Sequence, residues 1–153
     1  MIKVNVISEE KLWSKKIKKK EILFNKICKK FPNKLKFPGK KVYLTLLLSN
    51  NKKIKLLNKK FRNKNKHTDV LSFPFGKQNK IIQDIYLGDI IISFDYMNKP
   101  KNITNKEFKK KTIRIFIHGY LHLLGYDHIK DKDFKKMFLK EERVFKLVNK
   151  LLY

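Results

Sequence analysis

The sequence is poor in several residue types that mark common protein classes. It has one cysteine, five glycines and no alanine among 153 residues. A single cysteine, Cys28, excludes an internal disulfide and is typical of a protein from a reducing compartment. We expect Cys28 on the apolar side of a helix, as a buried, inert thiol rather than a reactive one. These features favour a cytoplasmic protein with no disulfide-linked partner.

Long apolar runs are also missing. No stretch approaches the roughly 18 consecutive apolar residues that a membrane-spanning helix needs, so we expect no membrane association. The first residues, MIKVNVISEEKLW, lack both a continuous apolar core and a small-residue cleavage site. We therefore expect no signal peptide. The length suffices for a real hydrophobic core, and we expect one domain over residues 1–153.

Acidic residues are scarce as well, and the net charge is +26. Such a surface attracts polyanions such as nucleic acids. The basic residues are 36 lysines and only 3 arginines, accompanied by 17 isoleucines and 13 asparagines. Lysine, isoleucine and asparagine have A/T-rich codons, so drift in base composition explains the charge as well as selection for polyanion binding does. Charge alone therefore does not identify a substrate.

Apolar periodicity predicts an α+β fold, with a small mixed β-sheet packed with helices. Pro74 suits an edge strand, and Gly88 predicts a bulge or a close backbone approach. A polar loop separates these two strands, and the order of strands in the sheet does not follow from the pattern. We expect strands at residues 2–7, 41–48, 69–75 and 84–94, and helices at residues 9–31, 51–61, 105–124 and 131–152.

Three of the four histidines lie in the segment HGYLHLLGYDH, residues 118–128. His118 and His122 are separated by about 6 Å along one face of the predicted helix, so both imidazoles reach one metal ion. A left-handed turn at Gly125 would return His128 to this pair. Three neutral imidazoles leave a fourth tetrahedral position for water, as in catalytic zinc sites. The alternative is three ordinary core or surface histidines.

The spacing resembles that of metzincin proteases, which carry a glutamate directly after the first histidine as general base. Gly119 occupies that position and supplies no base. Zinc lowers the pKa of its bound water toward about 7 without one. Such a site suits a leaving group that is easier to expel than an amine, as in a phosphodiester. A metal-dependent peptide hydrolase and a non-enzymatic ribosome- or RNA-binding protein remain the alternatives.

The histidine segment closely resembles the signature of the YbeY-type bacterial endoribonucleases. Residues 57–75 (LNKKFRNKNKHTDVLSFPF) and 87–93 (LGDIIIS) resemble two further segments of that family, in the same order. The resemblance implies a single-domain hydrolase related to the zincin fold, with one zinc ion on His118, His122 and His128. It also implies a single-strand-specific endoribonuclease that matures the 3′ end of 16S ribosomal RNA and serves ribosome quality control. Ribosomal RNA and the ribosome are then its partners.

The resemblance also places the functional arginine of the family at Arg62. A planar guanidinium grips a phosphate through two N–H groups and offsets charge in a phosphoryl transition state. The alternative is a solvated surface arginine. Arg114, one turn before His118, either serves instead of Arg62 or forms a structural ion pair.

Three aspartates are further candidates for orienting a metal ligand or binding substrate. Asp127 either orients a ligand imidazole or caps the turn after Gly125. Asp69 and Asp89 are either structural or substrate-binding, and the carboxylate of Asp89 faces the cleft if its strand is turned that way. Ser72 either binds phosphate or packs within its strand.

Aromatic residues and lysine runs near the motifs also have two interpretations. The aromatic side chains either stack on unpaired bases or pack in the core. The lysine runs either are solvated helix faces or follow an RNA backbone. The aromatic candidates are Phe61, Phe73, Phe75 and Tyr120, and the lysine runs are residues 15–20 and 106–111.

Overall fold

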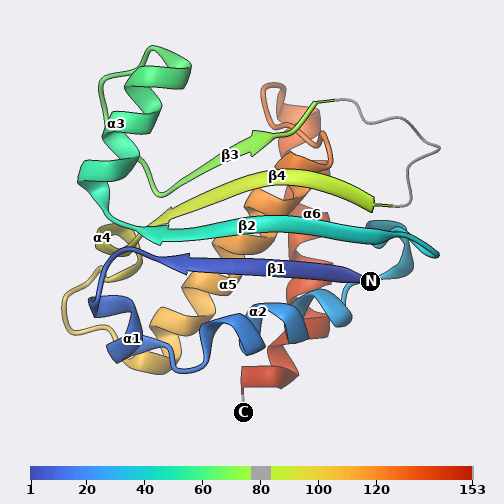
Figure 1. The fold of residues 1–153 in the computed structure, drawn as a ribbon, viewed down its shortest axis with the longest axis horizontal. Coiled ribbons are helices and arrows are strands. Elements are labelled where there is room, and N and C mark those ends of the chain that lie inside the picture. Colours follow the sequence, from blue (N-terminus) through green and yellow to red (C-terminus); the bar gives the residue numbers. More distant parts are fainter. Residues whose placement is uncertain (77–83, 153) are drawn as a thin grey trace.

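The computed structural model describes residues 1–76 and 84–152 and has a four-stranded sheet at its centre (Figure 1). The strands are arranged in the order β1-β2-β4-β3. β1, β2 and β4 run parallel, and β3 is antiparallel to β4 at the edge. The mixed sheet predicted from the sequence is therefore confirmed. The strands are β1 (Ile2–Ser8), β2 (Lys41–Ser49), β3 (Val70–Pro74) and β4 (Asp84–Ser93).

Helices cover the two faces of the sheet unequally (Figure 1). α2 packs along β1, α5 packs under β3 and β4, and α6 packs on α5. α3 lies on the opposite face, near the carboxyl ends of the parallel strands. The helices are α1 (Leu12–Lys16), α2 (Lys20–Lys29), α3 (Asn51–Arg62), α4 (Phe94–Met97), α5 (Asn105–Leu123) and α6 (Asp131–Val148), with 3₁₀ helices η1 (Asn33–Leu35) and η2 (Asn149–Leu152).

Side chains alternate along the strands and give each face its own core. The larger core lies between the sheet and α1, α2, α5 and α6, and includes four fully buried side chains of β2: Val42, Leu44, Leu46 and Leu48. On the opposite face, Ile54 of α3 packs with Leu71 and Ile91 in a smaller cluster. The second face of the sheet is therefore closed by α3 at one end only.

The single helix predicted at residues 9–31 is wrong, because the chain forms α1 and α2 with a turn between them. Lys19 in this turn has a φ of 48°. The indole of Trp13 in α1 donates to the carbonyl of Ser49, at 3.0 Å. The side chain of Asn25 in α2 instead bonds the backbone of β1. One straight helix does not reach both anchors, and no glycine or proline marks the turn.

Most other boundaries follow the sequence prediction. Asn50 caps α3 by accepting from the N–H of Lys53 at 3.0 Å, and Pro74 lies on the edge strand. Gly88 has a φ of 136°, and a Cβ there would lie 2.1 Å from the carbonyl oxygen of Phe73. The register between β2 and β4 shifts beside Gly88, so both a bulge and a close backbone approach are present. The polar loop predicted before β4 lies, apart from Gly76, outside the described residues.

The structure also bears on the expectations for Cys28 and for membrane-spanning helices. Cys28 is 1% exposed, and burial raises the pKa of its thiol well above the ordinary range. Its thiol is therefore protonated and inert at neutral pH. Among the described residues, no helix has both the length and the apolar composition that crossing a membrane requires.

Candidate metal centre and catalytic cleft

The end of α5 forms the turn that the sequence predicts at Gly125. The N–H of Gly125 donates to the carbonyl of His122 at 3.0 Å, and the N–H of Tyr126 donates to that of Leu121 at 3.1 Å. This pair of bonds is a Schellman motif, which requires a left-handed residue after the helix. Gly125 supplies it with a φ of 96°. The chain reverses there and carries His128 back towards the helix.

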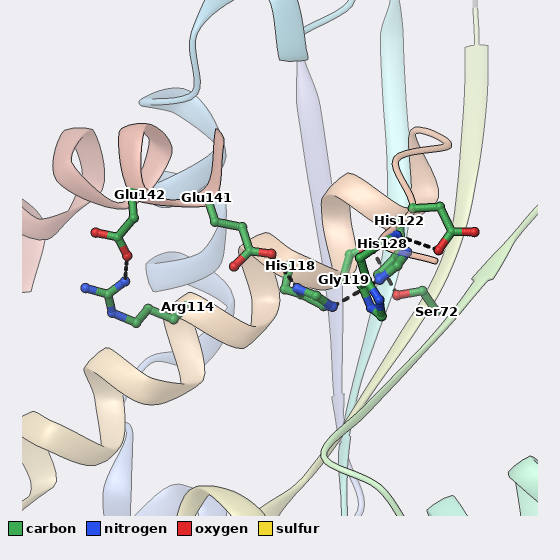
Figure 2. Close-up of polar contacts among 9 residues, drawn as sticks. Ser72, Arg114, His118, Gly119, His122, His128, Glu141 and Glu142 are labelled. Atoms are coloured by element: carbon green, nitrogen blue, oxygen red, sulfur yellow. Dashed lines mark hydrogen bonds and ion pairs between the residues drawn. The ribbon is translucent and has the colours of Figure 1, made fainter. Parts of the chain in front are cut away.

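Three imidazoles converge at this turn (Figure 2). One nitrogen from each of His118, His122 and His128 lies within 4.8 Å of the others. The Nε2 atoms of His118 and His122 are 3.0 Å apart. A tetrahedral zinc ion with bonds of about 2.0–2.1 Å holds its nitrogen ligands about 3.3 Å apart. Small rotations of the side chains therefore suffice to fit an ion, and an all-imidazole donor set suits zinc.

The local electrostatics favour the metal-binding form of His122. Burial lowers the pKa of this imidazole, and the neighbouring His118 and His128 lower it further. The carboxylate of Asp127 acts in the opposite direction but more weakly. Because only a neutral imidazole binds a metal ion, the lowered pKa keeps His122 ready for coordination at neutral pH.

A glutamate that the sequence analysis missed holds His118 in place. Oε1 of Glu141 in α6 contacts Nδ1 of His118 (Figure 2). A carboxylate at Nδ1 fixes the ring so that Nε2 faces the other two histidines. The next residue, Glu142, pairs instead with Arg114, which resolves the alternatives for Arg114 in favour of a structural ion pair. Two adjacent glutamates in the sequence give no sign of which one faces the histidine.

The histidines open into a cleft of about 700 Å³ that also contains Arg62. Arg62 is the last residue of α3, and its Nη2 donates to the carbonyl of Ser72 at 3.1 Å. Its guanidinium also lies over the ring of Phe73, 5.7 Å from the centroid. Residues distant in the sequence thus meet across β3, with the guanidinium held at two points.

Two lysines of the loop after α3 also line the cleft, and Asn58 holds that loop. Lys64 and Lys66 are both part of the cleft wall. The side chain of Asn58, which is 3% exposed, donates to the carbonyl of Lys66 at 2.9 Å. The backbone carbonyl of Asn58 accepts from the N–H of Lys64 at 3.2 Å. Sequence reasoning missed this role because an asparagine in a lysine-rich helix carries no distinguishing pattern.

Two of the three candidate aspartates lie in the cleft, and both bond the backbone. Asp127 accepts from the N–H of His128 at 2.7 Å. Asp69 accepts from the N–H of Val70 at 2.8 Å. Both carboxylates therefore fix the local backbone of the cleft wall.

The third aspartate, Asp89, does not join the histidines. It lies on the opposite face of the sheet and accepts a hydrogen bond from the hydroxyl of Tyr86. Alternation in β4 turns Asp89 to the same side as Ile91, whereas Ile90 faces α5. The suggestion that its carboxylate faces the cleft is wrong for this reason.

Gly119, which replaces the protease base, has a packing role. A Cβ at this position would lie 2.9 Å from Cγ2 of Ile90 and 3.1 Å from Oγ of Ser72. The hydroxyl of Ser72 donates to the carbonyl of Gly119 at 3.0 Å (Figure 2). Position 119 therefore faces the sheet, and the Ser72 hydroxyl serves strand packing. The next residue, Tyr120, is fully buried and belongs to the core, so it offers no stacking surface.

Known proteins share this arrangement of sequence and fold. The family model described as Endoribonuclease YbeY matches residues 6–149. A relative of that name from Pelagibacter ubique is 63% identical over 148 residues, covering 97% of each chain. Another from Ehrlichia canis is 35% identical and covers 99% of this chain and 93% of its own. The solution structure of TM1509 from Thermotoga maritima aligns with a TM-score of 0.56 at 30% identity, over 97% of this chain and 89% of that one.

Proposed function

This chain belongs to the Endoribonuclease YbeY family, and on that premise we propose that it is a metal-dependent endoribonuclease acting on single-stranded RNA. The observation that carries the proposal is the single cleft that joins the three histidines to Arg62. The site offers metal ligands on one wall and a fixed guanidinium on the other. This combination suits a phosphodiester, whose charge a guanidinium neutralises.

We assign one zinc ion to His118, His122 and His128, with water as the fourth ligand. Bound zinc would supply a hydroxide near neutral pH by lowering the pKa of its water to about 7. Glu141 supports this site by occupying Nδ1 of His118 and leaving Nε2 for the ion. The absence of a carboxylate at position 119 argues against the peptide hydrolase alternative.

Arg62 is the proposed catalytic residue on the opposite wall. One of its N–H groups is used on the carbonyl of Ser72, and a guanidinium has five N–H donors. The remaining donors are available to grip a phosphate and to offset the charge that develops during cleavage. Lys64 and Lys66 would bind neighbouring phosphates, which extends the grip along the strand.

Supporting roles are proposed for two aspartates. Asp127 would orient His128 through the hydrogen bond to its backbone N–H, and Asp69 would hold the start of β3 against the cleft. Asp89 has no proposed role in this cleft, since it lies on the other face of the sheet.

We further propose a biological setting for the single metallohydrolase domain at residues 1–153. The substrate would be ribosomal RNA in the cytoplasm, at the 3′ end of the 16S molecule, with a second role in ribosome quality control. Family membership supports this setting, and the net charge of +26 suits a polyanionic partner.

A pair of charge-reversal variants tests the proposed function. Purified protein loaded with zinc should cut single-stranded RNA in preference to a duplex, and a chelator should stop the reaction. Arg62→Glu should lower the cleavage rate by about 100-fold or more. Arg143→Glu makes the same change in charge at an exposed position of α6 and should leave the rate within a few-fold.

Two results would count against the proposal. Equal cleavage by both variants and the parent protein would identify a contaminating nuclease or a cleft without a role. Hydrolysis of a denatured protein, abolished by the chelator, would favour the peptide hydrolase instead.

A further inference from the structure

The second face of the sheet carries a groove outside the cleft. It measures about 460 Å³ and lies beside α3. Its floor is apolar and draws on all four strands through Ile7, Leu47, Phe73 and Ile91. α3 closes one side through Lys53, Leu57 and Phe61. An open apolar surface of this kind, on a chain with so many charges, is typical of a binding site.

Two aromatic pairs lie along β3 on this face. Phe61 packs edge-on against Phe73, with ring centroids 5.4 Å apart. Phe75 packs edge-on against Tyr86, with centroids 5.3 Å apart. Phe73 and Phe75 are two residues apart in extended chain, so their side chains leave the same side of the backbone about 7 Å apart. Phe61 is 60% exposed and Phe75 is 62% exposed, which leaves ring surface available for stacking.

Positive charge lies beside two of these rings and elsewhere on the same face of the sheet. Nζ of Lys60 lies 5.3 Å from the ring centroid of Phe61, and the guanidinium of Arg62 lies over Phe73. Lys3 and Lys41 are exposed on the same face, because they alternate in phase with groove residues of β1 and β2. Cations beside exposed rings hold a phosphate backbone while its bases stack.

Two acidic side chains, Glu9 and Asp89, also line the groove and restrict where phosphates can run. Glu9 pairs with Lys53 at 4.0 Å, and Asp89 accepts from the hydroxyl of Tyr86. Carboxylates repel phosphates but accept hydrogen bonds from the amino groups of bases. An RNA chain would therefore place its bases towards the groove and its phosphates along the lysines.

The groove and the cleft lie on the two sides of β3 and share no lining residue. The side chain of Ser72 faces α5, whereas that of Phe73 faces the groove. Arg62 joins the two sides, since it bonds the carbonyl of Ser72 and lies over the ring of Phe73. An RNA strand held by Arg62 in the cleft would therefore lie next to Phe73 and Phe61.

We propose that this aromatic groove, which is lined by Phe61 and Phe73 and extended along the same face by the Phe75–Tyr86 pair, binds single-stranded RNA by stacking the unpaired bases that flank the phosphodiester in the cleft. Exposed rings with neighbouring cations are the means by which proteins hold single strands with little sequence preference. An apolar peptide would need the apolar floor but neither the flat rings nor the cations. The continuation into the cleft rests on the proposed function, whereas stacking in the groove does not require cleavage.

The test measures RNA binding separately from cleavage. Fluorescence anisotropy would follow a short labelled single-stranded RNA with the full chain and a chelator. Phe61→Leu and Phe75→Leu keep apolar bulk but remove the flat ring. Each should weaken binding about fivefold, and the double variant about twentyfold. The matched control, Phe138→Leu, changes a ring that is 52% exposed on α6 and should keep the parent affinity.

Salt dependence distinguishes stacking from charge. The slope of log affinity against log salt should stay the same in the leucine variants, because no phosphate contact is lost. An RNA with abasic units should bind the parent protein more weakly, and Phe61→Leu should then cost little more.

Unchanged RNA affinity in both leucine variants overturns the inference. Sedimentation that shows self-association, lost in Phe61→Leu while RNA affinity is kept, overturns it as well. Cleavage that proceeds without any effect of the groove on binding contradicts this inference alone. Groove binding without cleavage supports the inference and contradicts the endoribonuclease proposal.

Discussion

The two sides of β3 differ in chemistry although they belong to one strand. On the side of α5, Ser72 packs on the helix that carries His118 and His122. On the side of α3, Phe73 packs with Phe61 in an aromatic groove. Strand alternation produces this division with a period of two residues. An edge strand can therefore separate the groups that would cut a chain from those that would hold it, with Arg62 serving both sides.

The largest effect is expected from a variant that removes a metal ligand from the cleft and leaves the groove unchanged. His118→Ala removes one of three proposed zinc ligands, so zinc affinity and the cleavage rate should each fall by more than about 100-fold. Metal analysis and a cleavage assay measure the two losses. RNA affinity in the presence of a chelator should stay at the parent value, because no groove residue changes. A parallel loss of RNA affinity would show that the two sides are not separable.

The second effect concerns the packing of β3 and β4 against α5. Gly119→Glu would place a carboxylate against Ile90 and Ser72, where even a Cβ lies 2.9 Å from the nearest atom. Overpacking and burial of charge should lower the free energy of unfolding by about 3 kcal/mol. Leu139→Glu adds the same group at a position that is 57% exposed and should change it by about 0.5 kcal/mol or less. Urea unfolding compares them, and equal midpoints would contradict the close approach of α5.

A smaller effect is expected from the carboxylate that orients His118 in the cleft. Glu141→Gln weakens the contact that orients His118, so zinc affinity should fall by about 10- to 100-fold. Glu142→Gln is the matched control, because it alters only the surface pair with Arg114. Competition with a zinc chelator measures both variants. Equal zinc affinity in the two variants would contradict a role for Glu141 in orienting His118.

Local features of this site were predictable and tertiary ones were not. His118, His122 and Gly125 follow from helical spacing and from the turn that a left-handed glycine makes, so the sequence alone indicates the metal centre. Arg62 came only from the family resemblance. The contact of Glu141 with His118 depends on how α6 packs on α5, and no local pattern encodes that packing.

The same limit explains the errors in the fold. A strand pattern gives the alternation of side chains but not which side meets which helix, so the face of Asp89 was open. The break between α1 and α2 has the same origin. Trp13 bonds the end of β2, whereas Asn25 bonds β1. The relative positions of these two bonding sites are set by the assembled sheet and do not lie along one helix axis.

A zinc titration of RNA cleavage decides whether the three histidines form a catalytic metal site. Metal-free protein would be mixed with single-stranded RNA, and zinc would be added in steps while the rate and the bound metal are measured. We expect no cleavage without metal and a rate that rises in proportion to bound zinc until each chain holds one ion. Cleavage that continues at full rate in the metal-free protein would contradict it.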